Sequence, residues 1–174
     1  MVLMAIIGEL GSGKTLSLTY MAFRNWLKGK AIYSNYKLNF PHTRVKNIKQ
    51  IDKMREGFFA GDELWLWLDS RASRKKVNIV VSSILAKSRK RGIHISYTTQ
   101  SFRQIDIRIR NITDFFGIPK LSPDERYCTF HMVSNPGYER IRSFRFPTQP
   151  FFKLYDTAEE IDPDLEMDDE DDED

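Results

Sequence analysis

The chain has 174 residues, 41% of them apolar, which is enough for one compact domain with a buried core and too few for two. Its single cysteine, Cys128, cannot form an internal disulfide, and the first residues do not form a secretory signal, so the composition favours a reducing, intracellular setting. No apolar run approaches the roughly 20 residues that a membrane-spanning helix needs, so we expect no membrane span.

The net charge of +3 conceals two parts of opposite charge. Residues 156–174 carry 13 of the 24 acidic residues and no Lys or Arg, so the 27 basic residues face only 11 acidic ones in residues 1–155, a net charge of +16. We therefore predict a folded domain at 1–155 and a disordered acidic tail at 156–174. A body this basic favours a polyanionic partner such as nucleic acid, although a solubilising surface has the same composition. The tail fits a solubiliser, a DNA mimic or a docking arm equally well.

Hydrophobic periodicity predicts strands and helices in alternation through the first two-thirds of the chain. In chain order the expected elements are a buried strand at 2–7, a helix from Lys14 to a stop at Gly29, a strand at 31–36 and a short polar helix at 48–55. A second helical pattern at 77–85 is followed by a stop at Gly92, and a strand then runs from 93 to about 100. Such alternation predicts an α/β fold with a mostly parallel sheet covered by helices.

The last third is less regular. The isoleucines between 105 and 112 fit both a strand and a helix, so this segment is left open. Two strand patterns, at 127–133 and 138–146, flank the turn sequence Ser134-Asn135-Pro136-Gly137, which predicts a β-hairpin.

One motif between the first strand and the first helix is specific. It matches G-x-x-x-x-G-K-[ST] at every position, as Gly8-Glu9-Leu10-Gly11-Ser12-Gly13-Lys14-Thr15. Glycines let the backbone curl so that consecutive N–H groups point at phosphate oxygens, and the helix that follows adds its positive end. Lys14 is expected to reach the β- and γ-phosphates of ATP, and the Thr15 hydroxyl to bind Mg²⁺.

Hydrolysis also needs a carboxylate near the metal and a base that orients water. Asp62 and Glu63 supply such a pair, with Asp62 as metal ligand and Glu63 as base. Asp69 competes, because it ends the stronger apolar run at 64–68, but Ser70 follows it and leaves no adjacent base. Gln100, at the end of the Thr98-Thr99 strand, is placed to contact the γ-phosphate or the attacking water.

Together these residues resemble the FtsK/HerA superfamily of DNA-translocating and DNA-packaging ATPases. The resemblance covers residues 2–116 and rests on the 8–15 loop, Asp62-Glu63, and the run from Arg89 through Gly92-Ile93-His94 to Thr99-Gln100. Further matches at 62–71, 88–90 and 105–110 are similar to the short members of archaeal viruses and to the Zot-like assembly ATPases of filamentous phages. The resemblance favours Asp62 over Asp69, although Gly61 weakens the expected strand before Asp62.

The resemblance implies a RecA-like P-loop domain of the ASCE type, with an extra strand between the strand before the loop and the strand before Asp62. It implies that Glu63 is the catalytic glutamate, that Gln100 is a sensor, and that subunits form a ring, commonly a hexamer. An arginine of one subunit then completes the site of its neighbour. Arg89 matches that arginine by position, with Arg71 and Arg110 as substitutes.

The function implied is an ATP- and Mg²⁺-dependent translocase of double-stranded DNA that packages a viral genome, with a capsid or portal as a further partner. It would work in the host cytoplasm or associated with the virion. The alternatives are a Zot-like assembly or extrusion ATPase, a P-loop kinase of small molecules and a non-hydrolysing scaffold. The intact Lys14, Thr15 and Glu63 argue against the scaffold.

Overall fold

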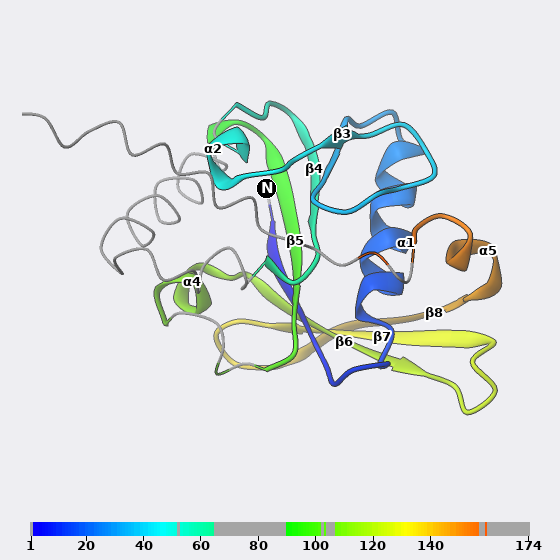
Figure 1. The fold of residues 1–174 in the computed structure, drawn as a ribbon. Helices are drawn as coiled ribbons and strands as arrows, with labels where there is room; N and C mark the ends of the chain where they lie inside the picture. Colours follow the sequence, from blue (N-terminus) through cyan, green and yellow to red (C-terminus); the bar gives the residue numbers. More distant parts are fainter. Residues whose placement is uncertain are drawn as a thin grey trace, which may run out of the picture.

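A single eight-stranded sheet organises the chain in this computed structural model, which describes residues 2–51, 53–64, 90–101, 103, 107–156 and 159 (Figure 1). The strands are β1 (Leu3–Ile7), β2 (Ile32–Ser34), β3 (Thr43–Arg44), β4 (Gly57–Gly61), β5 (Ile93–Thr99), β6 (Phe115–Leu121), β7 (Tyr127–Ser134) and β8 (Arg140–Pro147). The helices are α1 (Lys14–Trp26), α2 (Ile48–Ile51), α4 (Ile107–Ile112) and α5 (Gln149–Phe152).

The strand order is β3-β2-β4-β5-β1-β6-β7-β8, and all neighbours are parallel up to β6. The β6-β7 and β7-β8 pairs are antiparallel. β5 lies between β1 and β4, which confirms the extra strand that the family resemblance implies. The carboxyl ends of β1, β4 and β5 therefore meet at one edge, and the three candidate site segments follow these strands directly.

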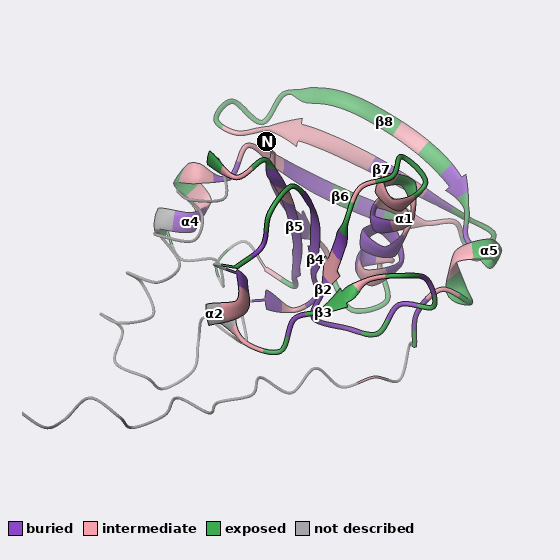
Figure 2. Ribbon diagram, turned by 90° about the horizontal axis from the view of Figure 1, so that it is seen from above, coloured by how far each residue is buried: buried purple, intermediate pink, exposed green. Residues whose placement is uncertain are grey.

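The sheet curves around α1, which lies in its hollow (Figure 2). On this face the core joins Leu16, Leu18 and Ala22 of α1 to Ile6 and Phe58 of the sheet. The opposite face has its own core, made by residues of β1, β4, β5 and β6 with Ile51, Met54 and Ile109. Both faces of the central strands are therefore buried, as the near-continuous apolar runs of a parallel sheet predict.

Aromatic packing fixes the hairpin and α5 against α1. Tyr20 stacks on Phe146 with ring centroids 4.1 Å apart and meets the edge of Phe151 at 5.0 Å. These contacts position α1, and with it the loop that precedes α1, relative to the far edge of the sheet.

Of the predicted elements, β1, α1, β2, β5 and the β7-β8 hairpin form at the expected places. The helix predicted at 48–55 forms only as α2, which ends at Ile51. The open segment is resolved as helix α4, at 107–112. The helical pattern at 77–85 lies outside the described residues, although Gly92 has the left-handed φ of +69° expected of a stop. The boundary between the domain at 1–155 and the acidic tail stays a prediction, because only Asp156 and Glu159 of the tail are described.

β6 was not predicted. Gly117 and Pro119 interrupt its sequence and are typical of breaks rather than strands. Gly117 is required by packing, because a Cβ there would lie 2.1 Å from the Phe130 ring on β7. Among the described residues, no helix is long and apolar enough to span a membrane.

Candidate nucleotide-binding site

The loop between β1 and α1 has the backbone that its glycines predict. Gly11 and Gly13 have φ angles of +75° and +92°, in the left-handed region where a side chain is strained. Gly8 is needed for another reason, since a Cβ there would lie 2.4 Å from the Ser12 Oγ. The Lys14 Nζ donates a hydrogen bond of 2.9 Å to the Glu9 carbonyl, so the lysine side chain arches over the loop.

The loop is prepared for an anion. Within the described part of the chain, the Ser12 hydroxyl is buried and has no hydrogen-bond partner. α1 begins at Lys14 with no acidic residue in its own first turn, so no carboxylate of the helix itself offsets the positive end that faces the loop. Burial lowers the pKa of Lys14, and the nearby carboxylates of Asp62 and Glu63 offset part of that effect. A phosphate group would satisfy the hydroxyl, the helix end and the ammonium together.

The carboxylate of Asp62 lies against the end of this loop. The Thr15 hydroxyl approaches its Oδ2 at 2.9 Å and its Oδ1 at 3.1 Å, although 47 residues separate the two in sequence. Hydroxyl and carboxylate oxygens are the ligands that Mg²⁺ prefers in nucleotide sites, so the pair fits that cation.

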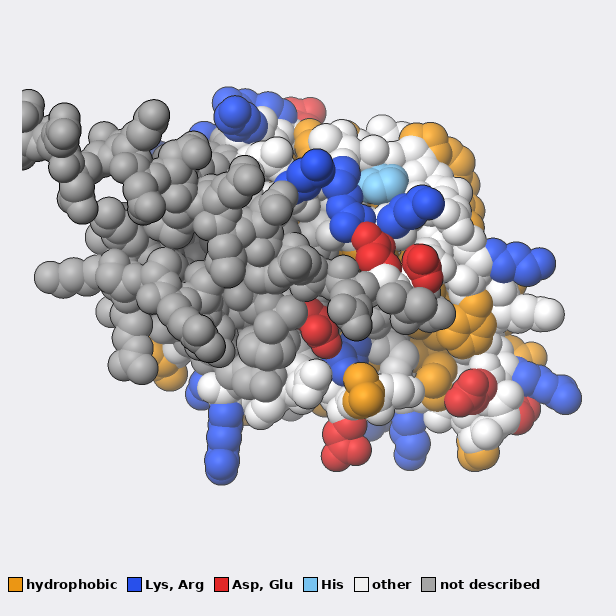
Figure 3. All heavy atoms as spheres, viewed as in Figure 1, with side chains coloured by type: hydrophobic (Ala, Val, Ile, Leu, Met, Phe, Trp, Pro, Cys, Tyr) orange, Lys and Arg blue, Asp and Glu red, His pale blue; other side chains and the backbone are white. Residues whose placement is uncertain are grey.

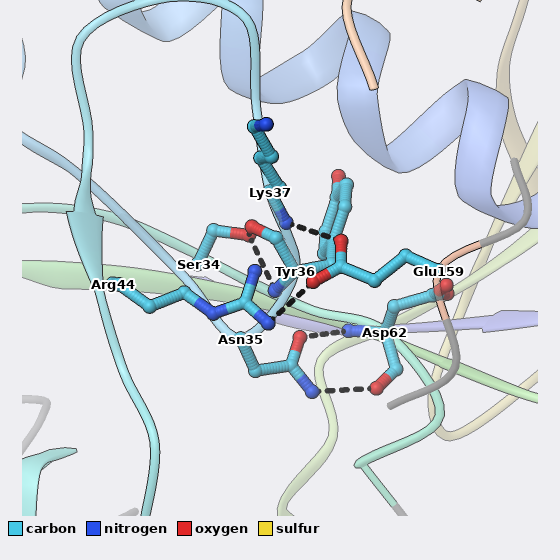
Figure 4. A network of polar contacts seen from close by, with 7 residues as sticks. All are labelled: Ser34, Asn35, Tyr36, Lys37, Arg44, Asp62 and Glu159. Atoms are coloured by element: carbon cyan, nitrogen blue, oxygen red, sulfur yellow. Dashed lines mark hydrogen bonds and ion pairs between the residues drawn. The ribbon is translucent and has the colours of Figure 1, made fainter. Parts of the chain in front are cut away.

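Two further side chains hold Asp62 in place. Thr98, on β5, donates a hydrogen bond of 2.6 Å to the Asp62 Oδ1. Asn35, which follows β2, holds the backbone of Asp62 at both ends, accepting from its N–H and donating to its carbonyl at 2.7 Å each (Figure 4). Asp62 is thus fixed by neighbours from the two strands that flank β4.

The environment of Asp62 makes its ionised form costly. Burial raises the pKa of Asp62, whereas the hydrogen bonds from Thr98 and Thr15 lower it, and Glu63 raises it further. A bound cation would remove much of this penalty, which is a second reason why the site fits a metal.

Glu63 has a left-handed φ of +44°, a conformation that costs a non-glycine residue roughly 1–2 kcal/mol. Its N–H donates to the Thr98 Oγ1 at 2.7 Å, so one hydroxyl holds both acidic residues. Strain of this kind is concentrated at functional sites. Gln100 is exposed and directly follows Thr99, which pairs with Ile7, so it lies beside the start of the loop.

The remaining candidates are only partly described. Arg89, Asp69 and Arg71 lie outside the described residues, so the structure does not compare Asp69 with Asp62 or place the arginine predicted to act in trans. Arg110 lies on α4 and is half-buried. These assignments stay predictions, as do the catalytic roles of Glu63 and Gln100.

Asn35 and Thr98 were not singled out from the sequence. Thr98 belongs to the Thr-Thr-Gln strand end, which was noted only for its glutamine. Asn35 follows an ordinary short strand and has no local signal, because its role depends on β2 lying beside β4.

No family model matches the chain. It is 32% identical over 127 residues to the uncharacterised protein ORF2 of Spiroplasma virus SpV1-R8A2 B; the match covers 67% of this chain and only 38% of that protein. The match thus spans well under half the length of this relative.

Two solved structures resemble the chain over most of its length. The N-terminal domain of zonular occludens toxin (Zot) from Neisseria meningitidis matches with a TM-score of 0.61 and 19% identity, covering 90% of this chain and 100% of that one. The genome packaging NTPase B204 from Sulfolobus turreted icosahedral virus 2, in complex with AMPPCP, matches with a TM-score of 0.55 and 12% identity, covering 82% and 96%. The chain therefore has the RecA-like P-loop NTPase fold that its motifs predict, shared with the Zot N-terminal domain and with a viral genome-packaging NTPase.

Proposed function

We propose that the chain hydrolyses ATP in the site formed by residues 8–15, Asp62 and Glu63, and that hydrolysis drives double-stranded viral DNA during genome packaging. The observation that carries the ATPase assignment is the contact between Thr15 and the Asp62 carboxylate. It joins the phosphate-binding loop to an acidic strand end across the intervening strand β5.

In this proposal the curled backbone of the loop and the positive end of α1 bind the phosphates, and Lys14 neutralises the β- and γ-phosphates. Thr15 and Asp62 would hold Mg²⁺, which polarises the phosphoryl oxygens when bound. Glu63 takes the proton of the attacking water, and Gln100 orients that water or detects the γ-phosphate.

The proposal that DNA is the substrate depends on the positive charge of residues 1–155 and on the similarity to viral proteins. Residues 1–155 carry a net charge of +16, which attracts a phosphate backbone without regard to sequence. Figure 3 shows Lys and Arg side chains spread over the described part of one face, with acidic ones among them, so no single patch there defines a DNA path. The viral relative and the likeness to a packaging NTPase support the same role. Assembly into a ring, in which Arg89 completes the neighbouring site, is part of the proposal, as are a capsid or portal partner and work in the host cell.

The test is the ATPase rate of the purified chain with Mg²⁺, with and without duplex DNA, over a range of salt concentrations. We expect hydrolysis that duplex DNA stimulates at low salt, with stimulation lost steeply as salt rises because counterion release drives binding. Asp62→Asn is the matched inactive control and gives the background rate. A wild-type rate no higher than this background under all conditions would refute the ATPase assignment. Hydrolysis that no DNA stimulates would refute translocation alone.

A second candidate is a Zot-like ATPase that assembles or extrudes virions. It is favoured by the match to the whole Zot N-terminal domain, which has the higher TM-score of the two reported structures. A motor that acts on virion proteins needs no duplex DNA, so ATP hydrolysis insensitive to DNA supports this candidate.

A further inference from the structure

A groove lies on the α1 face of the sheet, away from the phosphate-binding loop. Its volume is about 510 Å³, within the range of ligand sites. It runs between the second half of α1, the first residues of β1 and β5, and the β6-β7-β8 sheet. Its apolar lining includes Met4, Met21, Phe58, Phe115, Met132 and Phe144.

The rim of this groove is cationic. Arg24, Lys28 and Lys30 come from the end of α1 and the turn after it, and Arg142 comes from β8. Among the described residues, no Asp or Glu lines the groove. Burial lowers the pKa of His94, and the charge of Lys30 lowers it further, so the imidazole is neutral at neutral pH and the cationic charge comes from the Lys and Arg side chains.

The groove is separate from the nucleotide site. α1 has 13 residues and so spans roughly 20 Å, and the loop lies at its first residue whereas the groove lies at its last turns. No residue of the 8–15 loop lines the groove. A ligand that matched this groove would differ from the nucleotide and would combine anionic and apolar groups.

We propose that this groove binds the chain's own acidic segment, residues 160–174. The segment carries 11 carboxylates and also three apolar residues, Ile161, Leu165 and Met167, so it matches a cationic rim around an apolar floor. This is a more specific match than charge alone, because an acidic run without apolar residues would leave the floor unfilled. The docking concerns a surface outside the nucleotide site and does not depend on the proposed ATPase function.

The segment is long enough to reach. The residue before it, Glu159, is held by Arg44 at 2.6 Å and by the N–H of Lys37 at 2.6 Å (Figure 4). Fifteen residues extend to roughly 50 Å at most, more than twice the length of α1. A docked segment would cover Arg24, Lys28 and Arg142, three cations otherwise open to a polyanion.

The experiment is zero-length carbodiimide crosslinking of the full-length chain, which joins a lysine amine to a carboxylate in direct contact, followed by mass spectrometry. We expect crosslinks from Lys28 or Lys30 to carboxylates of 160–174, at a yield independent of protein concentration. Lys120, exposed on β6 outside the groove, serves as the internal control and should give at least about threefold less.

Two matched comparisons separate the groove from general attraction. Arg142→Glu should lower the yield about threefold, whereas Arg145→Glu, three positions along β8 and outside the groove lining, should leave it unchanged. Leu165→Asp should also lower the yield although it adds an acid, because it removes the apolar contact.

Three outcomes would overturn the proposal. Crosslinks shared equally with Lys120 would mean diffuse attraction. If Leu165→Asp leaves the crosslinking yield unchanged or raises it, the attraction is also diffuse. Crosslinks found only in covalent dimers, with a yield that rises with protein concentration, would assign the segment to a neighbouring chain.

Discussion

Replacing Thr98 by valine removes one hydroxyl and leaves the shape of the side chain almost unchanged. That hydroxyl donates to the Asp62 Oδ1 at 2.6 Å and accepts from the Glu63 N–H at 2.7 Å. Thr98 is fully buried, so water cannot easily replace either bond. The substitution therefore acts on both candidate acidic residues without removing either.

The magnitude follows from these two bonds. A hydrogen bond to a charged group contributes about 1.5–3 kcal/mol, and a buried N–H left without an acceptor costs about 1–3 kcal/mol. Because one hydroxyl makes both bonds, the losses are not independent, and we expect the free energy of unfolding to fall by about 2–4 kcal/mol. ATP turnover should fall at least about a hundredfold, because Glu63 loses the contact that holds its strained backbone.

The pH dependence of stability and turnover in Thr98→Val distinguishes a changed Asp62 environment from a fold that is only less stable. The Thr98 hydrogen bond lowers the pKa of Asp62 against the larger raising effect of burial, so its loss raises that pKa further. An acid with a raised folded-state pKa contributes stability that is present below its unfolded pKa and lost as pH rises through the folded pKa. The stability deficit of Thr98→Val should thus be larger at pH 7 than near pH 4. The acid limb of its pH–rate profile should move to higher pH.

The assay combines urea unfolding at both pH values with ATPase rates from pH 4 to 8. Thr98→Ser keeps the hydroxyl and should recover most activity. Thr99→Val, next on the strand with its hydroxyl bonded to the Ser101 carbonyl at 3.2 Å, is the matched control and should leave turnover within about threefold of wild type. Equal effects at 98 and 99, or a valine variant with wild-type turnover and an unshifted acid limb, would refute the positioning role of Thr98.

Four other variants test the site. Lys14→Ala should abolish tight ATP binding, and retained binding in equilibrium titration would contradict the loop assignment. Glu63→Gln should bind ATP yet turn over about a hundredfold more slowly, measured by single-turnover kinetics. Asp62→Asn should lose Mg²⁺-dependent turnover but raise the stability of the nucleotide-free chain by about 0.5–2 kcal/mol, because it removes a buried charge; a lower melting temperature would be evidence against that reasoning. Arg89→Ala and Glu63→Gln subunits, each inactive alone, should regain activity when mixed, whereas mixed rings that stay inactive would exclude Arg89 from a role in trans.

The phosphate-binding loop could be predicted because its requirements are local. The positive φ angles of Gly11 and Gly13 and the close contact at Gly8 depend on residues within the loop, and each position favours glycine. The strand before the loop and the helix after it follow from periodicity alone. In the loop and the two elements that flank it, sequence and structure agree because the interactions are short in range.

The strand before Asp62 is harder to predict from the local sequence. Hydrophobicity favoured the run at 64–68, most of which lies outside the described residues, and the glycine-flanked β4 forms a strand inside the sheet, between β2 and β5. Gly57 is there because β2 approaches closely, since a Cβ at that position would lie 2.5 Å from the Ala31 carbonyl oxygen. Gly57 is therefore a consequence of strand packing, which the sequence does not show. At Gly61, the glycine that weakened the strand pattern, a Cβ would lie 3.2 Å from the Phe59 ring.

The residues that hold Asp62 also could not be predicted from the local sequence. Asn35 and Thr98 are 27 and 36 positions away, and they reach Asp62 only because β2 and β5 both flank β4. Neither side chain belongs to a motif with fixed spacing, so only the strand order brings them together.

The contacts next to Asn35 also determine at which residue a deletion of the acidic segment should begin. Asn35 opens the stretch 35–39, and the segment after α5 packs onto that stretch: the Asn39 N–H donates to the Leu154 carbonyl, and Tyr155 meets the Tyr36 ring. Glu159 continues these contacts through Arg44 and the Lys37 N–H.

A deletion from residue 156 would remove Glu159 and leave the Lys37 N–H and Arg44 without this carboxylate, next to the residue that clamps Asp62. Loss of ATPase activity in that deletion could then come from a disturbed contact between Asn35 and Asp62 as readily as from the missing acidic charge. A deletion that begins at residue 160 keeps these contacts and still removes 11 carboxylates. Only that variant isolates the effect of the acidic segment on DNA binding, which should tighten if the segment covers cations that DNA would otherwise contact.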